Sequence, residues 1–190
     1  MAHNDTGMFL TYWQNLRRKA GQTPQRSAFD PVQLKSLLPS VFMLTARDGF
    51  RFRLIGERVE RLHGAGFKGR AFSGLFEKPH QALSVAALTL ARQREEALRL
   101  KISVPTADGE LSAEMILVPL RNADGLVDRF AGIYEVYGGL PAGFEDTHPL
   151  DMGAPLAGPL ILHAAQIEDT QTEVLQAHTR LIVLNERRVA

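Results

Sequence analysis

The sequence predicts an α+β domain built around one antiparallel sheet of five strands. Three Asp-Gly dipeptides, at 48–49, 108–109 and 124–125, each stand between two runs that are typical of β-strands. Asp-Gly is a strong hairpin signal, because a type I′ turn needs positive φ at both central residues. A long helical stretch separates the first hairpin from the later three strands. A hairpin, a helical insertion and a three-stranded meander together indicate the α+β class.

Length and composition fit one globular domain with extensions. The chain has 190 residues, of which 45% are hydrophobic and 23% are charged, and its net charge is +1. These values are ordinary for a globular protein that buries a core. The small net charge gives no strong field for nucleic acid, and no apolar run reaches the about 20 residues of a membrane helix. Cysteine is absent, which excludes disulfide scaffolds and favours a cytoplasmic protein.

Residues 1–39 are predicted to form an N-terminal helical segment. Phe9, Trp13 and Leu16 recur at helical spacing within a helix expected over residues 6–19. This stripe is too apolar to leave in water at about 25 cal/mol per Å². It covers either the chain's own sheet or the same helix of a second copy. We predict the second arrangement, a homodimer with Phe9, Trp13 and Leu16 at its interface.

Residues 40–137 hold the predicted sheet domain. Its strands are expected at 41–46, 50–55, 98–104, 110–120 and 127–137, with 50–55 on one edge and 98–104 on the other. Strand alternation separates apolar inward faces from charged outward faces. On the charged face, Glu114 should lie within salt-bridge reach of Arg99 or Lys101, since neighbouring strands of a meander face each other. From the inward faces and the glycine-rich stretch after the first hairpin we select the cavity-lining candidates, which are Phe52, Leu54, Phe67, Met115 and Tyr134.

The helical insertion contains the one nucleotide-like motif of the chain. Residues 64–69 match G-x-G-x-x-G, but a dinucleotide fingerprint must directly follow a strand and open a helix. Here a short helix precedes the motif, so turn formation explains these glycines better. No pair of the six histidines has the i, i+4 spacing of a helical zinc site. We therefore predict no metal site and assign no catalytic residue.

Residues 138–190 are predicted to be a Pro/Gly-rich linker followed by a tail. The composition changes at Gly138, where glycine and proline become frequent. Beyond the linker, an amphipathic helix is expected around residues 164–178. A short apolar run follows at 180–184.

Five stretches of the chain match known motifs in their order and spacing: 12–17 (YWQNLR), 24–31 (PQRSAFDP), 37–44 (LLPSVFML), 52–64 (FRLIGERVERLHG) and 69–76 (GRAFSGLF). Together they resemble the PAS domain, in particular a stand-alone, largely alphaproteobacterial PAS-like family. The resemblance implies a five-stranded sheet in the order B-A-I-H-G with helices on one face. It also implies a sensory or protein-interaction module, usually dimeric, and many PAS domains bind a small molecule between sheet and helices. The cysteine of flavin-binding light sensors is absent. Residues 81–97 lack the histidine that a haem would need, so neither haem nor flavin-adduct chemistry is expected.

The leading hypothesis is a non-enzymatic module of bacterial signalling. It would form a homodimer and bind an unidentified signalling protein. It would sense either by direct contact or through a small ligand. Two alternatives remain, which are a small-molecule carrier and a cavity-based enzyme of the isomerase or hydrolase type. Such an enzyme needs an Asp or Glu with a raised pKa in an apolar pocket. The inferred inward faces contain no carboxylate, which counts against it.

Overall fold

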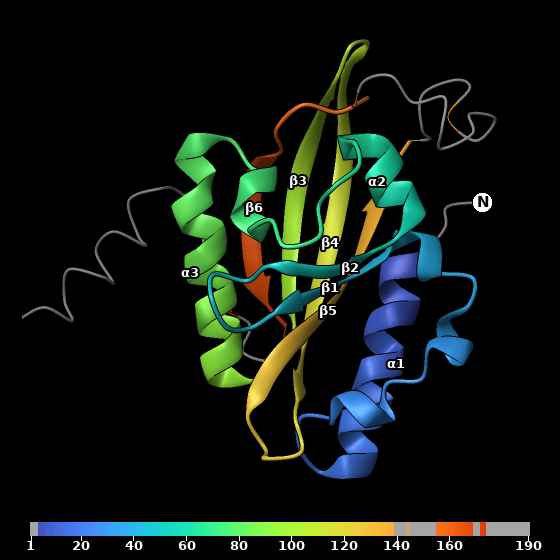
Figure 1. Cartoon of the computed structure of the whole chain (residues 1–190), viewed down its shortest axis with the longest axis vertical. Coiled ribbons are helices and arrows are strands. Elements are labelled where there is room, and N and C mark those ends of the chain that lie inside the picture. Colours follow the sequence, from blue (N-terminus) through green and yellow to red (C-terminus); the bar gives the residue numbers. More distant parts are fainter. Residues whose placement is uncertain (1–3, 139–143, 145–154, 169–171, 174–190) are drawn as a thin grey trace, which may run out of the picture.

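An antiparallel sheet of seven strands, in the order β2-β1-β5-β4-β3-β6-β7, forms the centre of the protein (Figure 1). The computed structural model describes residues 4–138, 144, 155–168 and 172–173. The strands are β1 (Val41–Thr45), β2 (Phe52–Ile55), β3 (Leu98–Thr106), β4 (Gly109–Arg121), β5 (Val127–Val136), β6 (Ile161–Ile167) and β7 (Thr172–Glu173). The five strands of the predicted domain keep the predicted order, which confirms the fold class.

Strand β6 corrects two sequence-based expectations. It pairs with β3 from Leu98↔Ile167 to Ser103↔Ile161, so β3 is not an edge strand and the sheet has more than five strands. The prediction of a helix over 164–178 is wrong for the residues that the structure describes, 164–168 and 172–173. The remaining residues of that range, and the apolar run at 180–184, lie outside the described residues. The register shifts where Lys101 pairs with Ala164 and Ile102 with Leu162. His163 is thus an extra residue, which breaks the period-2 alternation between the buried residues Leu162 and Ala165.

All three predicted hairpins are present, although their turns differ in detail. Asp48, Gly49 and Phe50 all have positive φ, of 56°, 82° and 52°. The Thr45 N–H donates to the Arg51 carbonyl, so residues 46–50 form a longer loop than the two-residue type I′ turn that Asp-Gly predicts. In the second hairpin Thr106 pairs with Gly109, so the two turn residues lie one position earlier than Asp-Gly. In the third hairpin Gly125, with φ of 80°, donates its N–H to the Asn122 carbonyl.

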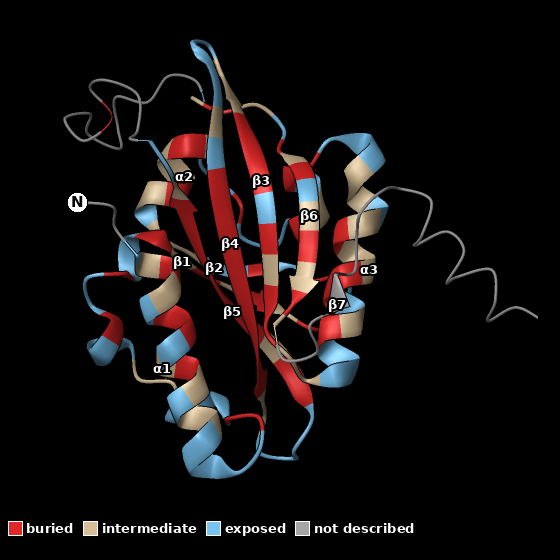
Figure 2. Cartoon of the chain, turned by 180° about the vertical axis from the view of Figure 1, so that it is seen from behind, coloured by how far each residue is buried: buried red, intermediate tan, exposed pale blue. Residues whose placement is uncertain are grey.

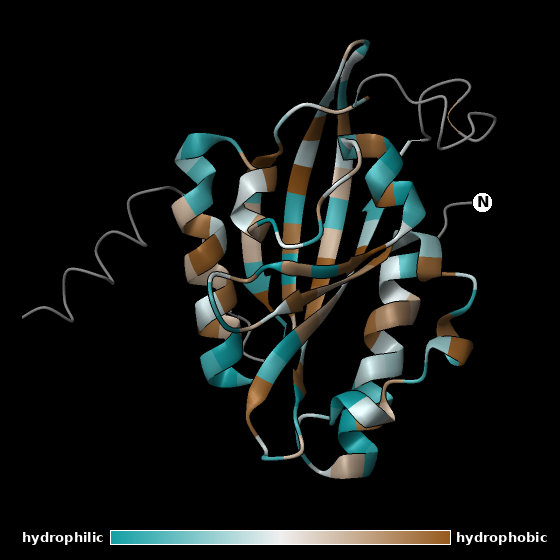
Figure 3. Ribbon diagram, in the orientation of Figure 1, coloured by the Kyte–Doolittle hydropathy of each residue, from teal (hydrophilic) through white to brown (hydrophobic). Residues whose placement is uncertain are grey.

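The inner face of the sheet is covered by α2 (Glu57–His63), the 3-10 helix η4 (Phe72–Leu75) and α3 (Lys78–Arg94) (Figure 1). Helix α3 begins with Pro79 in its first turn and buries Ser84, Ala87, Leu88 and Ala91. These helices and the inward residues of β1 to β6 form one buried group, the inner cluster. In Figure 3 brown and teal segments alternate along β3, as expected for a strand with one apolar face.

On the opposite, outer face, β4 and β5 are covered by α1 (Asp5–Ala20) and by the segment that follows it, with the 3-10 helices η1 (Arg26–Ala28), η2 (Pro31–Leu34) and η3 (Leu38–Ser40), whereas β3 and β6 lie to one side of α1 (Figure 2). Leu34 and Leu37 from this segment join Phe9, Leu10 and Trp13 of α1. They pack on the outward residues Ile116, Val118, Leu120, Ala131 and Ile133 of β4 and β5, which gives a second buried group, the outer cluster.

Backbone hydrogen bonds cover part of each sheet edge. At β2, the Gly69 N–H donates to the Phe52 carbonyl and the Phe52 N–H donates to the Arg70 carbonyl. At the start of β6, the Leu160 N–H donates to the Leu75 carbonyl. At β2, these bonds leave fewer backbone groups free to pair with another chain.

Candidate functional site

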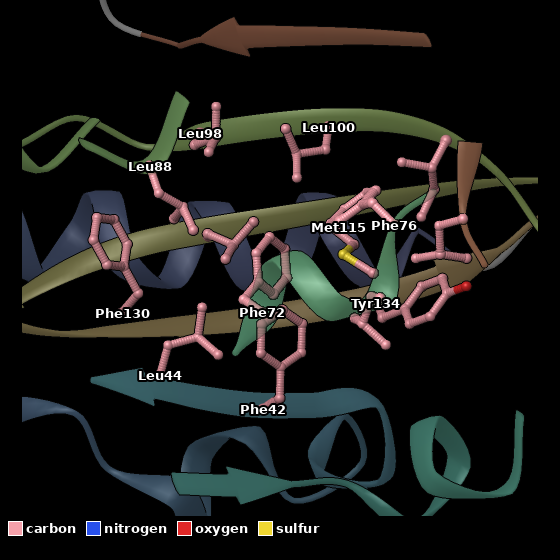
Figure 4. Packing of buried hydrophobic residues seen from close by; sticks show 14 of the residues in the cluster. Phe42, Leu44, Phe72, Phe76, Leu88, Leu98, Leu100, Met115, Phe130 and Tyr134 are labelled. Atoms are coloured by element: carbon pink, nitrogen blue, oxygen red, sulfur yellow. The ribbon is translucent and has the colours of Figure 1, made fainter. Parts of the chain in front are cut away.

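Four of the five predicted cavity-lining residues meet inside the inner cluster. Phe52, Phe67, Met115 and Tyr134 are at most 6% exposed. The ring centroids of Phe52 and Phe67 are 5.6 Å apart, and Met115 faces Tyr134 across strands β4 and β5. Figure 4 shows Met115 and Tyr134 side by side beneath the helices. Their burial matches the expected inward orientation, and their role in lining a binding cavity stays a prediction.

The fifth candidate, Leu54, is wrong: its side chain is 65% exposed. Leu44 pairs with Phe52 and Met43 pairs with Leu54, so Arg53 has no partner on β1. This bulge reverses the alternation of inward and outward side chains beyond Phe52. A prediction from strict alternation could not detect it.

The sequence analysis missed the polar group of this region, His63 at the end of α2. The imidazole stacks on the Tyr134 ring, with centroids 5.6 Å apart and planes at 21°. Its Nε2 lies 3.1 Å from the Tyr134 hydroxyl. The centroids of the His63 and Phe67 rings are 6.3 Å apart. A lone histidine carries no spacing signal, and its partner is 71 residues away in the sequence.

Burial decides the protonation states of this pair. Desolvation lowers the pKa of His63 from 6.5 to about 4, so the imidazole is neutral at pH 7. Desolvation also raises the pKa of the Tyr134 phenol above its usual value. The pair is therefore a neutral donor and acceptor in aromatic surroundings, which suits hydrogen bonding to an uncharged group.

Glycines in the turn after α2 allow Phe67 to lie close to His63. Gly64, Gly66 and Gly69 all have positive φ, of 85°, 88° and 84°. These conformations turn the chain back after α2, so that Phe67 packs on Phe52 while the Arg70 guanidinium lies 5.5 Å from the Phe67 centroid. The glycines of the G-x-G-x-x-G stretch form turns, as the sequence analysis expected.

Aromatic rings fill the neighbouring space between sheet and helices. Phe72 stacks on Phe42 with centroids 6.0 Å apart, and the Phe72 and Phe76 centroids are 5.3 Å apart (Figure 4).

Three carboxylates are buried among the described residues, Glu114, Asp128 and Glu135. Glu114 pairs with Arg99, Asp128 with Arg26 and Arg129, and Glu135 with Thr6. In the described part of the chain, no group of three or more His, Asp and Glu is arranged to hold a metal ion.

The predicted interface residues lie against the chain's own sheet. Phe9 and Trp13 are 0% exposed within one chain, and Leu16 is half-buried. The Trp13 Nε1–H donates to the Pro119 carbonyl over 3.0 Å. Phe9 and Trp13 thus have no free surface for a partner, which corrects their assignment as dimer contacts. Of the two surfaces considered for this stripe, the structure selects the chain's own sheet.

Polar contacts secure the first turn of α1 and cross the outer face. The Glu135 Oε2 accepts hydrogen bonds from the Thr6 N–H and from the Thr6 hydroxyl, each 3.0 Å long. The Arg99 guanidinium bridges Glu114 and Glu168, at 2.5 Å from each, which confirms the predicted Arg99–Glu114 pair. The Tyr137 hydroxyl donates to the Glu114 carboxylate over 3.1 Å. Glu114 and Glu135 are therefore buried on this face, whereas Lys101 is exposed.

A family model described as the PAS domain matches residues 1–135. The chain therefore belongs to the PAS domain family, which places it among sensory signalling modules that are generally non-enzymatic. The match includes α1, so the helix on the outer face is part of the family unit.

Solved structures with similar folds are PAS and Light-Oxygen-Voltage domains. An RNA-binding Light-Oxygen-Voltage receptor has a TM-score of 0.46 at 18% identity, over 58% of this chain and 34% of that one. The Drosophila melanogaster Cycle PAS-B domain with bound ethylene glycol has a TM-score of 0.42 at 14% identity, over 51% and 98%. The Rhodobacter sphaeroides Light-Oxygen-Voltage protein has a TM-score of 0.44 at 15% identity, over 62% and 74%. No curated protein matches the sequence.

None of the helices in the described part of the chain has the length and apolar character needed to cross a membrane.

Proposed function

We propose that this protein is a non-enzymatic sensory and protein-interaction module of bacterial signalling, active in the cytoplasm. The observation that carries the proposal is the PAS family match over residues 1–135. Acid–base catalysis in a cavity needs a carboxyl group in an apolar pocket, whereas two of the three buried carboxylates, Glu114 and Glu135, are hydrogen-bonded on the outer face, to Arg99 and Tyr137 and to Thr6.

The proposed sensing site lies at the His63–Tyr134 pair. A stacked, neutral imidazole and phenol beside Phe67 can hold a small, uncharged and mostly apolar molecule through one or two hydrogen bonds. Phe67 follows a glycine-rich turn, so it is the side chain best placed to move aside for such a molecule. The output is a change in contacts with an unidentified signalling protein. A homodimer stays a prediction, and it requires a surface other than Phe9 and Trp13.

Native mass spectrometry of the purified protein tests the ligand and the subunit number together. We expect one small-molecule adduct on the wild-type chain and its loss in Tyr134→Phe, which removes the hydroxyl and keeps the ring. Leu126→Ala is the matched control, because Leu126 is 57% exposed and should leave the adduct in place. An adduct that survives Tyr134→Phe, or a wild-type chain that carries no adduct, would refute this sensing site.

A further inference from the structure

Five exposed cations gather at the β2 edge of the sheet. Arg51 and Arg53 flank Phe52, while Lys68 and Arg70 flank Gly69, and Phe52 and Gly69 share a backbone hydrogen bond of 2.8 Å. Arg47 lies in the turn that leads into β2. We call this group, Arg47, Arg51, Arg53, Lys68 and Arg70, the basic edge.

The basic edge concentrates positive charge that the chain does not balance. Residues 45–55 and 64–74 hold these five cations and one carboxylate, Asp48, a net charge of +4. Since the whole chain carries +1, the remaining sequence carries −3. Within the described residues, none of the five cations forms an ion pair with a carboxylate. The charge is therefore available to an external anion.

The cations are mounted on a rigid framework. The bonds between Phe52 and residues 69–70 join the two segments, and Arg51 Nη1 donates to the Gly69 carbonyl over 2.9 Å. Arg70 lies over the Phe67 ring, 5.5 Å from its centroid. Because the backbone is already fixed, binding here orders few additional groups, which favours affinity.

An apolar side chain lies next to these charges. Leu54, 65% exposed, directly follows the bulged residue Arg53, and its partner on β1, Met43, is only half-buried. Arginine is enriched at protein–protein interfaces, and a polar rim usually surrounds the buried apolar contact.

We propose that the basic edge binds an acidic segment of a partner protein, with Leu54 as its apolar contact. This deepens the proposed function, since it names the surface and the chemistry of the partner through which the module signals. A symmetric contact with a second copy would bring like charges together. Nucleic acid is disfavoured because the chain's net charge of +1 provides no wider positive field.

Fluorescence anisotropy with a labelled synthetic peptide, in which glutamates flank one leucine, tests the proposal on the full chain. The double variant Arg53→Glu/Lys68→Glu should weaken binding about tenfold or more. Lys19→Glu/Lys35→Glu makes the same change in net charge at exposed positions outside the basic edge and should leave the dissociation constant within about twofold. Leu54→Ser should weaken binding of this peptide but not of polyglutamate. Circular dichroism confirms that each variant is folded.

Three outcomes would overturn the proposal. The peptide could fail to bind, both double variants could lose binding equally, or single-stranded polyuridine could bind the basic edge more tightly than the peptide. None of these results depends on the small-molecule adduct seen in native mass spectrometry. A failure here therefore leaves the sensing site at His63 and Tyr134 to its own test.

Discussion

The two faces of the sheet are closed in different ways. The inner face is covered by α2, η4 and α3, which follow β2 directly in the sequence, and its contacts are almost entirely apolar and aromatic. The outer face is covered by α1, which contacts strands more than 100 residues away, and it combines the apolar outer cluster with buried hydrogen bonds to Glu135. The inner face thus resembles an ordinary core. The outer face depends on one helix, which hydrogen bonds hold at Trp13, to Pro119, and at Thr6, to Glu135. That difference predicts how each face responds to substitution.

The largest effect is expected on the outer face, at Trp13. Trp13→Ala removes a fully buried indole and its hydrogen bond to Pro119, and should lower the free energy of unfolding by about 3–5 kcal/mol. Urea denaturation measures this loss. Leu16→Ala on the same helix, half-buried, is the control and should cost clearly less. Equal losses from the two variants would show that α1 is not anchored through Trp13.

On the inner face, Gly132 lies in close contact with the Phe42 ring. A Cβ at position 132 would lie 2.3 Å from the Phe42 ring, which is itself 1% exposed. Gly132→Ala should therefore cost about 1–3 kcal/mol of unfolding free energy, because overpacking displaces a fixed ring. The double variant with Phe42→Leu should lose less than the two single variants combined. Additive losses would contradict this packing.

Acid should weaken the inner face through His63. Its folded-state pKa of about 4 lies below the unfolded value of 6.5, so the unfolded chain binds more protons between these limits. Stability is therefore complete above about pH 6.5 and falls as the pH drops toward 4, by about 1–2 kcal/mol after allowance for partial exposure. Denaturation of wild type and His63→Phe across this range compares the two slopes. Parallel slopes would mean that His63 is not desolvated.

The smallest effect should come from the second attachment of α1. Asn4 provides no side-chain cap, and Glu135 instead accepts from the Thr6 N–H. Glu135→Gln removes the negative charge at this helix N-terminus and should cost about 0.3–1 kcal/mol. Hydrogen exchange should become faster in the first turn of α1 and stay the same in α3. Unchanged hydrogen exchange in that turn would show that Glu135 does not help to hold the helix.

Local patterns predicted the inner face well. Alternation placed Phe52, Met115 and Tyr134 inward, and Asp-Gly located all three hairpins. On the outer face, alternation also paired Arg99 with Glu114. At Leu54 a bulge adds a residue and breaks the period-2 pattern, and β6 carries a similar bulge at His163. Sequence spacing cannot show such an insertion, because hydrogen bonding with the neighbouring strand determines it.

The outer face and the polar pair depended on contacts between distant residues. The stripe of Phe9 and Trp13 showed that a surface is covered, but not whether one chain or two provide the cover. His63 gave no signal because Tyr134, its partner, lies on a strand far along the sequence. Sequence reasoning identified the elements that form the faces, while their assembly required the tertiary structure.

The fluorescence of Trp13, the single tryptophan of the chain, tests most directly the claim that α1 closes the outer face of its own sheet. An indole that is 0% exposed within one chain should show blue-shifted emission that does not change on dilution from micromolar to low nanomolar protein, because intramolecular contacts do not depend on concentration. A shift toward the red on dilution, at constant far-ultraviolet circular dichroism, would contradict this result. It would show that a second copy covers Trp13.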